Sequence, residues 1–197
     1  MAHGIALLVI DMQESMARSQ EPGDPRIRLL STIRVLVRQA QFHSIPVGYI
    51  WTPPLENSHD VQVPNVDRPA KPLPNSVEDG LLEEFLVLPK DFVVTKSGWS
   101  AFNFTSLGYH LARLGIHTII VTGIATNLSV ESTVRDAFDH RFHILTITDA
   151  MLGTSKDEHY FTITRTFPRL SRVMSSTQLV NWLGAAQGGT NPRGHGL

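Results

Sequence analysis

The clearest indication of the fold comes from residues 118–129, TIIVTGIATNLS. Its first five residues are apolar or β-branched, which is typical of a strand buried on both faces of a parallel sheet. Gly123 then allows a turn, and the apolar spacing of residues 127–140 predicts a helix directly after it. A buried strand that turns straight into a helix is the building unit of an α/β fold.

The same alternation of strand and helix continues along the chain and predicts βαβ units with a parallel sheet. The chain has 197 residues, of which 42% are hydrophobic, enough for one core and too few for two comfortable domains. We therefore expect a single domain over residues 1–197. Strands are predicted at residues 5–10, 45–51, 91–96, 118–122, 142–148 and 173–174, and helices at 26–43, 105–114, 127–140, 156–167 and 177–183.

Composition restricts the partners and the location that we expect. The formal net charge is −1 and the chain has no cysteine. The charge balance does not favour nucleic acid or an anionic membrane, and the lack of cysteine excludes disulfides and thiolate metal sites. No apolar run approaches the ~20 residues that span a bilayer, and the first residues lack a signal-peptide pattern. We expect a cytoplasmic protein with neither nucleic-acid nor membrane partners.

Two segments lack periodic apolar positions. Residues 53–74 are rich in proline and are predicted to form a long irregular loop, and loops of this length are typically functional, disordered or partner-facing. The glycine-rich residues 184–197 are predicted to form a flexible tail.

Two predicted strands end in ionisable residues. Asp11 follows the strand at 5–10, and Lys96 ends the strand at 91–96. Sites in such sheets gather at the carboxyl ends of the strands. A desolvated aspartate there can act as a general base, and a lysine can hold it in place and stabilise developing negative charge. Taken alone, Asp11 could instead be a helix-capping or loop aspartate, and Lys96 could be a solvated lysine.

The turn at residues 123–129 combines three features that favour chemistry. The start of a helix presents unpaired N–H groups and the positive end of the helix dipole. The amides from Ala125 to Ser129 could therefore bind an oxyanion, and a nucleophile at Ser129 would lie beside them. The alternative is that Thr126 or Asn127 caps the helix and Ser129 is an ordinary small residue. Both interpretations use the same geometry.

Several familiar motifs are missing from the sequence. The histidines are scattered without metal-ligand spacing, so we expect no metal. No Gly-x-Gly-x-x-Gly follows the first strand and no Gly-Lys-Ser/Thr occurs, which disfavours dinucleotides and nucleoside triphosphates. No Gly-x-Ser-x-Gly occurs, which disfavours the common esterase fold. We expect a small-molecule substrate and no cofactor.

Taken together, these segments resemble the isochorismatase-like superfamily, also called cysteine hydrolases. The resemblance extends from about residue 5 to residue 183. It implies a three-layer α/β/α fold, with a six-stranded parallel sheet in the order 3-2-1-4-5-6 and helices on both faces. It also implies a homo-oligomer, a dimer or a tetramer. The matching segments are residues 6–13 (ALLVIDMQ), 96–102 (KSGWSAF), 123–127 (GIATN), 130–137 (VESTVRDA) and 146–150 (TITDA).

The resemblance implies a catalytic Asp–Lys–Cys set. Asp11 matches the general base and Lys96 matches the lysine, while the family's cysteine falls on Ser129. In the family the peptide before the residue that matches Ala125 is typically cis. The amides of Ala125 and Ser129 would then form an oxyanion hole.

A serine at the nucleophile position has three competing explanations. A hydroxyl loses its proton far less readily than a thiol of pKa about 8.5, and an Asp–Lys pair activates an alcohol poorly. Ser129 is therefore an engineered replacement of cysteine, the mark of a natural branch that needs no covalent step, or the sign of an inactive relative. The residues around Ser129 match the amide-cleaving branch closely, which favours the first explanation.

We expect the cysteine form to hydrolyse a small amide or ureido C–N bond, and Ser129 to inactivate or alter that activity. Isochorismate-type vinyl ether hydrolysis by Asp11, without a covalent nucleophile, and a non-catalytic binding protein are the alternatives. The aspartate and histidines of the family's metal-dependent nicotinamidases are missing from residues 51–57 (WTPPLEN), which disfavours that activity. The candidate substrate-binding residues are Gln13, Trp51, Trp99, Phe102, Ile124 and Asn127.

Overall fold

The computed structural model describes residues 4–53, 66–67, 80 and 82–187. The strands are β1 (Ile5–Ile10), β2 (Val47–Trp51), β3 (Phe92–Thr95), β4 (Thr118–Ile124), β5 (His143–Leu152) and β6 (Arg172–Met174). The α-helices are α1 (Glu14–Ala17), α2 (Pro25–Phe42), α3 (Leu107–Arg113), α4 (Glu131–Asp139), α5 (Lys156–Phe161) and α6 (Ser176–Gln187). Two π-helical turns, Thr126–Val130 and Thr162–Thr166, and the 3-10 turn Phe167–Arg169 complete the helical segments.

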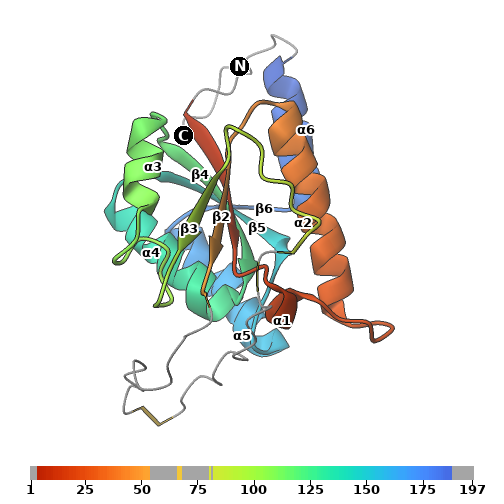
Figure 1. The fold of residues 1–197 in the computed structure, drawn as a ribbon. Helices are drawn as coiled ribbons and strands as arrows, with labels where there is room; N and C mark the ends of the chain where they lie inside the picture. The colour runs from red at the N-terminus through yellow and green to blue at the C-terminus, as the bar shows by residue number, and fades with distance from the viewer. Residues whose placement is uncertain (1–3, 54–65, 68–79, 81, 188–197) are drawn as a thin grey trace.

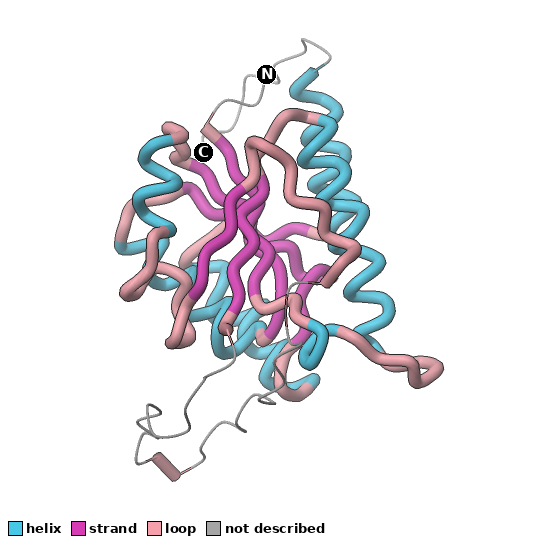
Figure 2. The backbone as a smooth tube through the Cα atoms, in the orientation of Figure 1, coloured by secondary structure: helices cyan, strands magenta, loops and turns pink. Residues whose placement is uncertain are grey.

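The six strands form one parallel sheet in the order β3-β2-β1-β4-β5-β6, as the resemblance implies. Helices α2 and α6 cover one face of the sheet, and α3 and α4 cover the other (Figure 1). The strands form a central layer between the two helical layers (Figure 2). The predicted three-layer α/β/α fold is confirmed.

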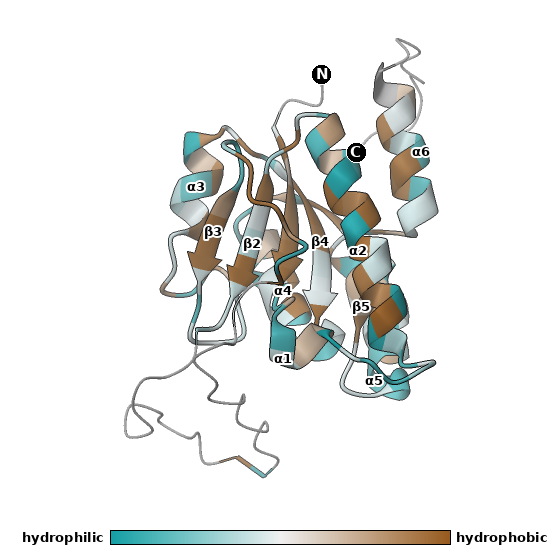
Figure 3. Ribbon diagram, turned by 45° about the vertical axis from the view of Figure 1, so that its right-hand side comes forward, coloured by the Kyte–Doolittle hydropathy of each residue, from teal (hydrophilic) through white to brown (hydrophobic). Residues whose placement is uncertain are grey.

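Strand β1 is buried along its whole length because both faces of the sheet are covered. Leu7 and Val9 belong to the core shared with α2 and α6, whereas Leu8 and Ile10 belong to the core shared with α3 and α4. All four side chains are at most 1% exposed. The strands are accordingly coloured mostly as hydrophobic in Figure 3. Double burial explains the continuous apolar runs of the sequence.

The largest difference from the predicted strands is in β5. It runs to Leu152, whereas the pattern predicts an end at residue 148. The pairing with β4 shifts register between Val121 and Gly123, and β5 resumes pairing at Met151. The irregularity breaks the apolar pattern before the strand ends, so the sequence does not show the last part of β5.

The helices differ from the prediction mainly in how they begin. The segment predicted as one helix at 127–140 starts with the π-helical turn Thr126–Val130 before α4. The segment predicted at 156–167 divides into α5, a π-helical turn and a 3-10 turn. Phe138, one of the apolar residues whose spacing predicts the helix at 127–140, is 49% exposed. The sequence does not predict α1, which is too short to show periodicity.

The two irregular segments are described only in part. Helix α6 continues to Gln187, so the helix includes the first residues of the predicted tail at 184–197. Residues 188–197, and most of the predicted loop at 53–74, lie outside the described residues.

Candidate active site

Asp11 is the first residue after β1, at the carboxyl end of the sheet. Its N–H donates to the carbonyl of Ile50 on β2 over 2.8 Å. Its φ is 52°, a left-handed value that aspartate adopts more readily than most residues. The residue is 2% exposed, so it is not an ordinary solvated loop aspartate.

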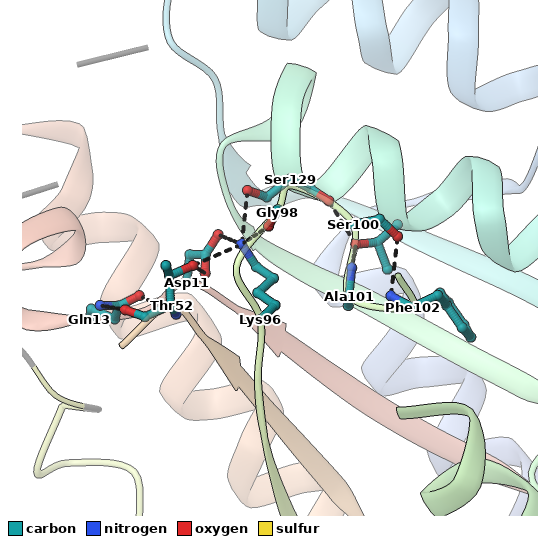
Figure 4. Close-up of polar contacts among 10 residues, drawn as sticks. Asp11, Gln13, Thr52, Lys96, Gly98, Ser100, Ala101, Phe102 and Ser129 are labelled. Atoms are coloured by element: carbon teal, nitrogen blue, oxygen red, sulfur yellow. Dashed lines mark hydrogen bonds and ion pairs between the residues drawn. The ribbon is translucent and has the colours of Figure 1, made fainter. Parts of the chain in front are cut away.

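Lys96 follows β3 and forms an ion pair with Asp11. Its Nζ lies 2.7 Å from Asp11 Oδ2, and the two side chains are 2% and 3% exposed (Figure 4). The same Nζ donates to Thr52 Oγ1 (3.2 Å) and to the carbonyl of Gly98 (3.1 Å). The lysine is therefore held by several oxygens from different segments, and the solvated-lysine alternative is wrong.

The environment of Asp11 favours proton binding. Burial raises the pKa of the Asp11 carboxyl above its usual range. The charge of Lys96, and hydrogen bonds from Lys96, Ser129 and Thr52, oppose the rise without cancelling it. A carboxylate of raised pKa next to a cation can accept a proton from a neighbouring group and return it later.

Ser129 lies in the π-helical turn that follows β4. Its Oγ is 3.5 Å from Lys96 Nζ, and the residue is 7% exposed. Asp11, Lys96 and Ser129 come from the carboxyl ends of three different strands, yet they meet in one buried contact (Figure 4). The structure therefore brings together the three residues predicted to be catalytic.

Two hydrogen bonds connect the backbone around Ser129 to the segment after Lys96. Thr133 Oγ1 donates to the carbonyl of Ser129 over 2.7 Å. The N–H of Ala101 donates to the same Thr133 Oγ1 over 3.0 Å. These bonds connect the residues after β3 to the helix after β4, which fixes Lys96 and Ser129 relative to each other.

Gly123 is required by the close packing of β4 against β1. Its φ is 126°, and a Cβ at this position would lie 2.1 Å from the carbonyl oxygen of Ile10. Any side chain would therefore push the turn away from Asp11. In the same turn, the peptide bond between Ile124 and Ala125 is cis, as the resemblance implies.

The helix after β4 is not capped as the alternative predicted. The helical segment begins after Ala125, whose carbonyl accepts hydrogen bonds from the N–H groups of Leu128 and Val130. No side chain caps the start of the segment. Thr126 Oγ1 instead shares a hydrogen bond with His159 Nδ1, and Asn127 bonds to Thr154. The capping alternative for Thr126 and Asn127 is therefore wrong.

Three predicted substrate-binding residues lie at or just after the ends of β1, β2 and β4. Gln13 is fully buried, and its side-chain amide donates to the carbonyl of Thr52 (3.0 Å) and accepts from its N–H (2.9 Å). Trp51 is half-buried at the end of β2, and Ile124 is buried at the end of β4. Gln13 thus holds Thr52 in contact with Lys96.

The structure places two other predicted residues away from the contact. Phe102 stacks against His140 and packs against Phe142, with ring centroids 5.1 and 5.8 Å apart. Trp99 is 53% exposed. It lines an open surface cavity of about 360 Å³ with Ser100, Asn103, Ser132, Arg135 and Asp136. Neither aromatic ring belongs to the buried Asp11–Lys96–Ser129 contact.

Two residues of the site were not predicted. Thr52 Oγ1 contacts both Lys96 Nζ and Asp11 Oδ1, the latter at 3.5 Å. It is the first residue after β2, so the strand-end rule that selected Asp11 could have found it. His159 contacts Thr126 from α5, and no local pattern marks it.

The described residues offer neither a metal-binding cluster nor a membrane-spanning helix. Among them, no group of three or more His, Asp or Glu side chains is arranged to hold a metal ion. Within the same part of the chain, no helix combines the length and the apolar character needed to cross a bilayer.

The chain is similar to a family of known proteins over most of its length. The isochorismatase domain family matches residues 5–178. The isochorismatase family protein YwoC of Bacillus subtilis is 32% identical over 178 residues, which are 89% of this chain and 92% of YwoC. The ureidoacrylate amidohydrolase RutB of Pantoea ananatis is 41% identical over 70 residues, 36% of this chain and 28% of RutB. The structure of an isochorismatase family protein from Burkholderia thailandensis superposes with a TM-score of 0.82 at 29% identity, covering 92% of this chain and 96% of that one.

Proposed function

This chain belongs to the isochorismatase family of hydrolases, and we propose that its Asp11–Lys96–Ser129 site is built to cleave a small amide or ureido C–N bond. One observation carries the proposal: Lys96 Nζ lies 2.7 Å from the Asp11 carboxylate and 3.5 Å from Ser129 Oγ in a buried contact. A base, a cation and a nucleophile position are the parts that acyl transfer requires. The similarity to RutB, an amidohydrolase, supports the choice of a C–N bond.

The proposed reaction requires a cysteine at residue 129. Asp11 takes the thiol proton, and the thiolate attacks the carbonyl carbon to form a tetrahedral intermediate. The intermediate collapses as Asp11 returns the proton to the departing amine, which leaves a thioester on residue 129. Asp11 then takes a proton from water, and the hydroxide attacks the thioester carbon. The C–S bond breaks to release the acid, and the thiolate takes the proton back from Asp11, which regenerates the thiol. The raised pKa of Asp11 suits a group that must both take and give this proton.

The negative charge of the tetrahedral intermediate needs hydrogen-bond donors. We assign this role to the amides of Ala125 and Ser129. Ser129 lies in the first turn of the helical segment that continues into α4, where the dipole of the helix is positive. Lys96 adds a full positive charge next to residue 129.

Ser129 explains why we expect almost no turnover from the chain as it stands. The Ser129 hydroxyl must lose its proton to the Asp11 carboxylate, which is already paired with Lys96. An alcohol holds its proton much more tightly than a thiol does. Serine and cysteine have similar shapes, so we expect the site to keep its capacity to bind an amide.

The test is Ser129→Cys, assayed by release of ammonia from a panel of small amides and ureido compounds. We expect a gain of about 10³-fold or more, because the nucleophile is the part whose loss abolishes turnover. Ser132→Cys is the matched control, since it adds a thiol one helical turn away. Asp11→Asn in the Ser129→Cys chain should abolish the gain. No gain on any amide would refute the proposal.

A second candidate is favoured by the oxygen at residue 129 together with the raised pKa of Asp11. In isochorismate-type hydrolysis, the Asp11 carboxyl would protonate a vinyl ether carbon and water would add to the resulting cation. This route needs no nucleophile on the protein. It predicts that the chain cleaves a vinyl ether as it stands and that Ser129→Ala retains this activity, whereas Asp11→Asn loses it.

A further inference from the structure

The turn that carries Ser129 is held from outside by a histidine that the proposed reaction does not use. Thr126 is fully buried, and its Oγ1 lies 2.8 Å from His159 Nδ1. His159 is half-buried on α5, 33 residues further along the chain. Burial lowers its pKa below the usual histidine range, so the imidazole is neutral at pH 7. A neutral ring keeps one nitrogen as an acceptor and the other as a donor.

The neighbouring residue of the turn is held by the same segment. Asn127 Nδ2 donates to Thr154 Oγ1 (2.8 Å), and Asn127 Oδ1 accepts from the N–H of Thr154 (3.0 Å). Thr162, the first residue after α5, donates from its Oγ1 to Oε2 of Glu131, the first residue of α4, over 3.0 Å. Residues 154–162 therefore contact the start of the Ser129 helix at three points.

Gly153 makes the approach of His159 possible. A Cβ on Gly153 would lie 2.7 Å from His159 Cβ and 3.0 Å from the His159 backbone. These contacts are too short for any side chain, and two of the three contacted atoms belong to the backbone. An alanine at this position would displace α5 and, with it, the imidazole.

We propose that His159 is a positioning residue: through Thr126 it fixes the turn of residues 124–129, and so the place of residue 129 relative to Lys96. The proposal rests on the proposed function of that site. The buried Thr126 hydroxyl needs a partner, and His159 supplies it at 2.8 Å. Ser129 Oγ lies 3.5 Å from Lys96 Nζ, which is the outer limit for a hydrogen bond, so a small shift of the turn breaks the contact.

The test uses the Ser129→Cys chain as background and four changes: His159→Leu, His159→Asn, Thr126→Val and the double variant Thr126→Val with His159→Leu. Asparagine places a polar atom near the position of Nδ1, whereas leucine removes it. Two quantities are measured: kcat and KM for the amide that the chain cleaves, and the rate constant for alkylation of the introduced thiol by iodoacetamide. The alkylation needs no substrate and reports the thiolate beside Lys96 and Asp11.

We expect His159→Leu to lower kcat and the alkylation rate by about two- to tenfold, the factor that one hydrogen bond is worth, with little change in KM. His159→Asn should restore most of both. The double variant should lose no more than either single variant, because each removes the same bond. Equal losses for leucine and asparagine, or losses that multiply in the double variant, would overturn the proposal.

A second pair of variants tests the same contact without changing a polar group. Gly153→Ala should reproduce the effect of His159→Leu, while Gly184→Ala, where an added Cβ meets nothing within 4 Å, should change neither quantity. An unchanged alkylation rate in Gly153→Ala would count against the role of His159. If the Ser129→Cys chain cleaves no amide, the proposed function fails, and the alkylation rates still decide the role of His159.

Discussion

Lys96→Met tests whether the Asp11–Lys96 contact behaves as a buried charge pair. Methionine keeps a long unbranched side chain and removes the ammonium that lies 2.7 Å from the carboxylate. Exposed ion pairs contribute about 0–1 kcal/mol, but these side chains are only 2% and 3% exposed. Removing one partner of a buried pair costs about 3–5 kcal/mol, and we expect this loss in the free energy of unfolding at pH 8.

The pH dependence of that loss identifies its cause. Burial raises the pKa of folded Asp11 above the unfolded value of about 3.9, and Lys96 opposes the rise. Without Lys96 the folded pKa rises further. The folded state then binds the Asp11 proton more tightly than the unfolded state does. This proton binding stabilises the fold fully below pH ~3.9, and the stabilisation is lost as the pH rises through the folded pKa. The deficit of Lys96→Met should therefore be larger at pH 8 than at pH 5.

Urea unfolding followed by circular dichroism at pH 5 and pH 8 measures the deficit. Asp11→Asn with Lys96→Met is the control, because it removes the unpaired charge. We expect the double variant to recover a large part of the loss at pH 8, and its free energy of unfolding to change less between pH 5 and pH 8 than that of Lys96→Met, because it has no carboxyl at residue 11. A loss for Lys96→Met below ~1 kcal/mol, or one that does not change with pH, would refute the reasoning.

Two further substitutions test the backbone that holds the site. Gly123→Ala should cost about 3–5 kcal/mol in urea unfolding, since it combines a disfavoured φ of 126° with a Cβ 2.1 Å from Ile10 O, whereas Gly184→Ala should change stability by no more than ~1 kcal/mol. Gln13→Ala should cost about 2–3 kcal/mol, because both backbone groups of Thr52 lose a buried partner. In the cysteine form it should also lower amide hydrolysis, because Thr52 contacts Lys96; unchanged kinetics would contradict that link.

The sequence predicts the catalytic candidates because each follows a predicted strand, and for Asp11 and Ser129 that strand is buried on both faces. Strands β1 and β4 lie side by side in the middle of the sheet and are buried on both faces, so their apolar runs end visibly at Asp11 and Gly123. Parallel strands end at the same edge of the sheet. With the strand order that the resemblance implies, Asp11, Lys96 and Ser129 are therefore expected at neighbouring points of that edge.

The contacts that hold the site could not be read in the same way. Thr52 meets Asp11 across 41 residues, and His159 meets Thr126 across 33 residues. Such contacts depend on loop paths, which no periodic pattern encodes. Phe102 illustrates the reverse error: it lies in a segment that matches the family, yet its ring packs against His140 and Phe142. A match in sequence identifies a segment and leaves the direction of each side chain open.

The exchange of sulfur for oxygen at residue 129 concerns chemistry more than folding. The backbone of Ser129 is fixed by Thr133 through its carbonyl, and the turn is fixed by Thr126 and Asn127 through contacts with α5 and its preceding loop. None of these bonds uses the Ser129 side chain. The Oγ faces the Asp11–Lys96 pair instead, and its contact with Lys96 Nζ is long, at 3.5 Å. Because the site is built from its surroundings, a gain of activity in Ser129→Cys can be attributed to the nucleophile itself, and a failure to gain activity cannot be blamed on a distorted site.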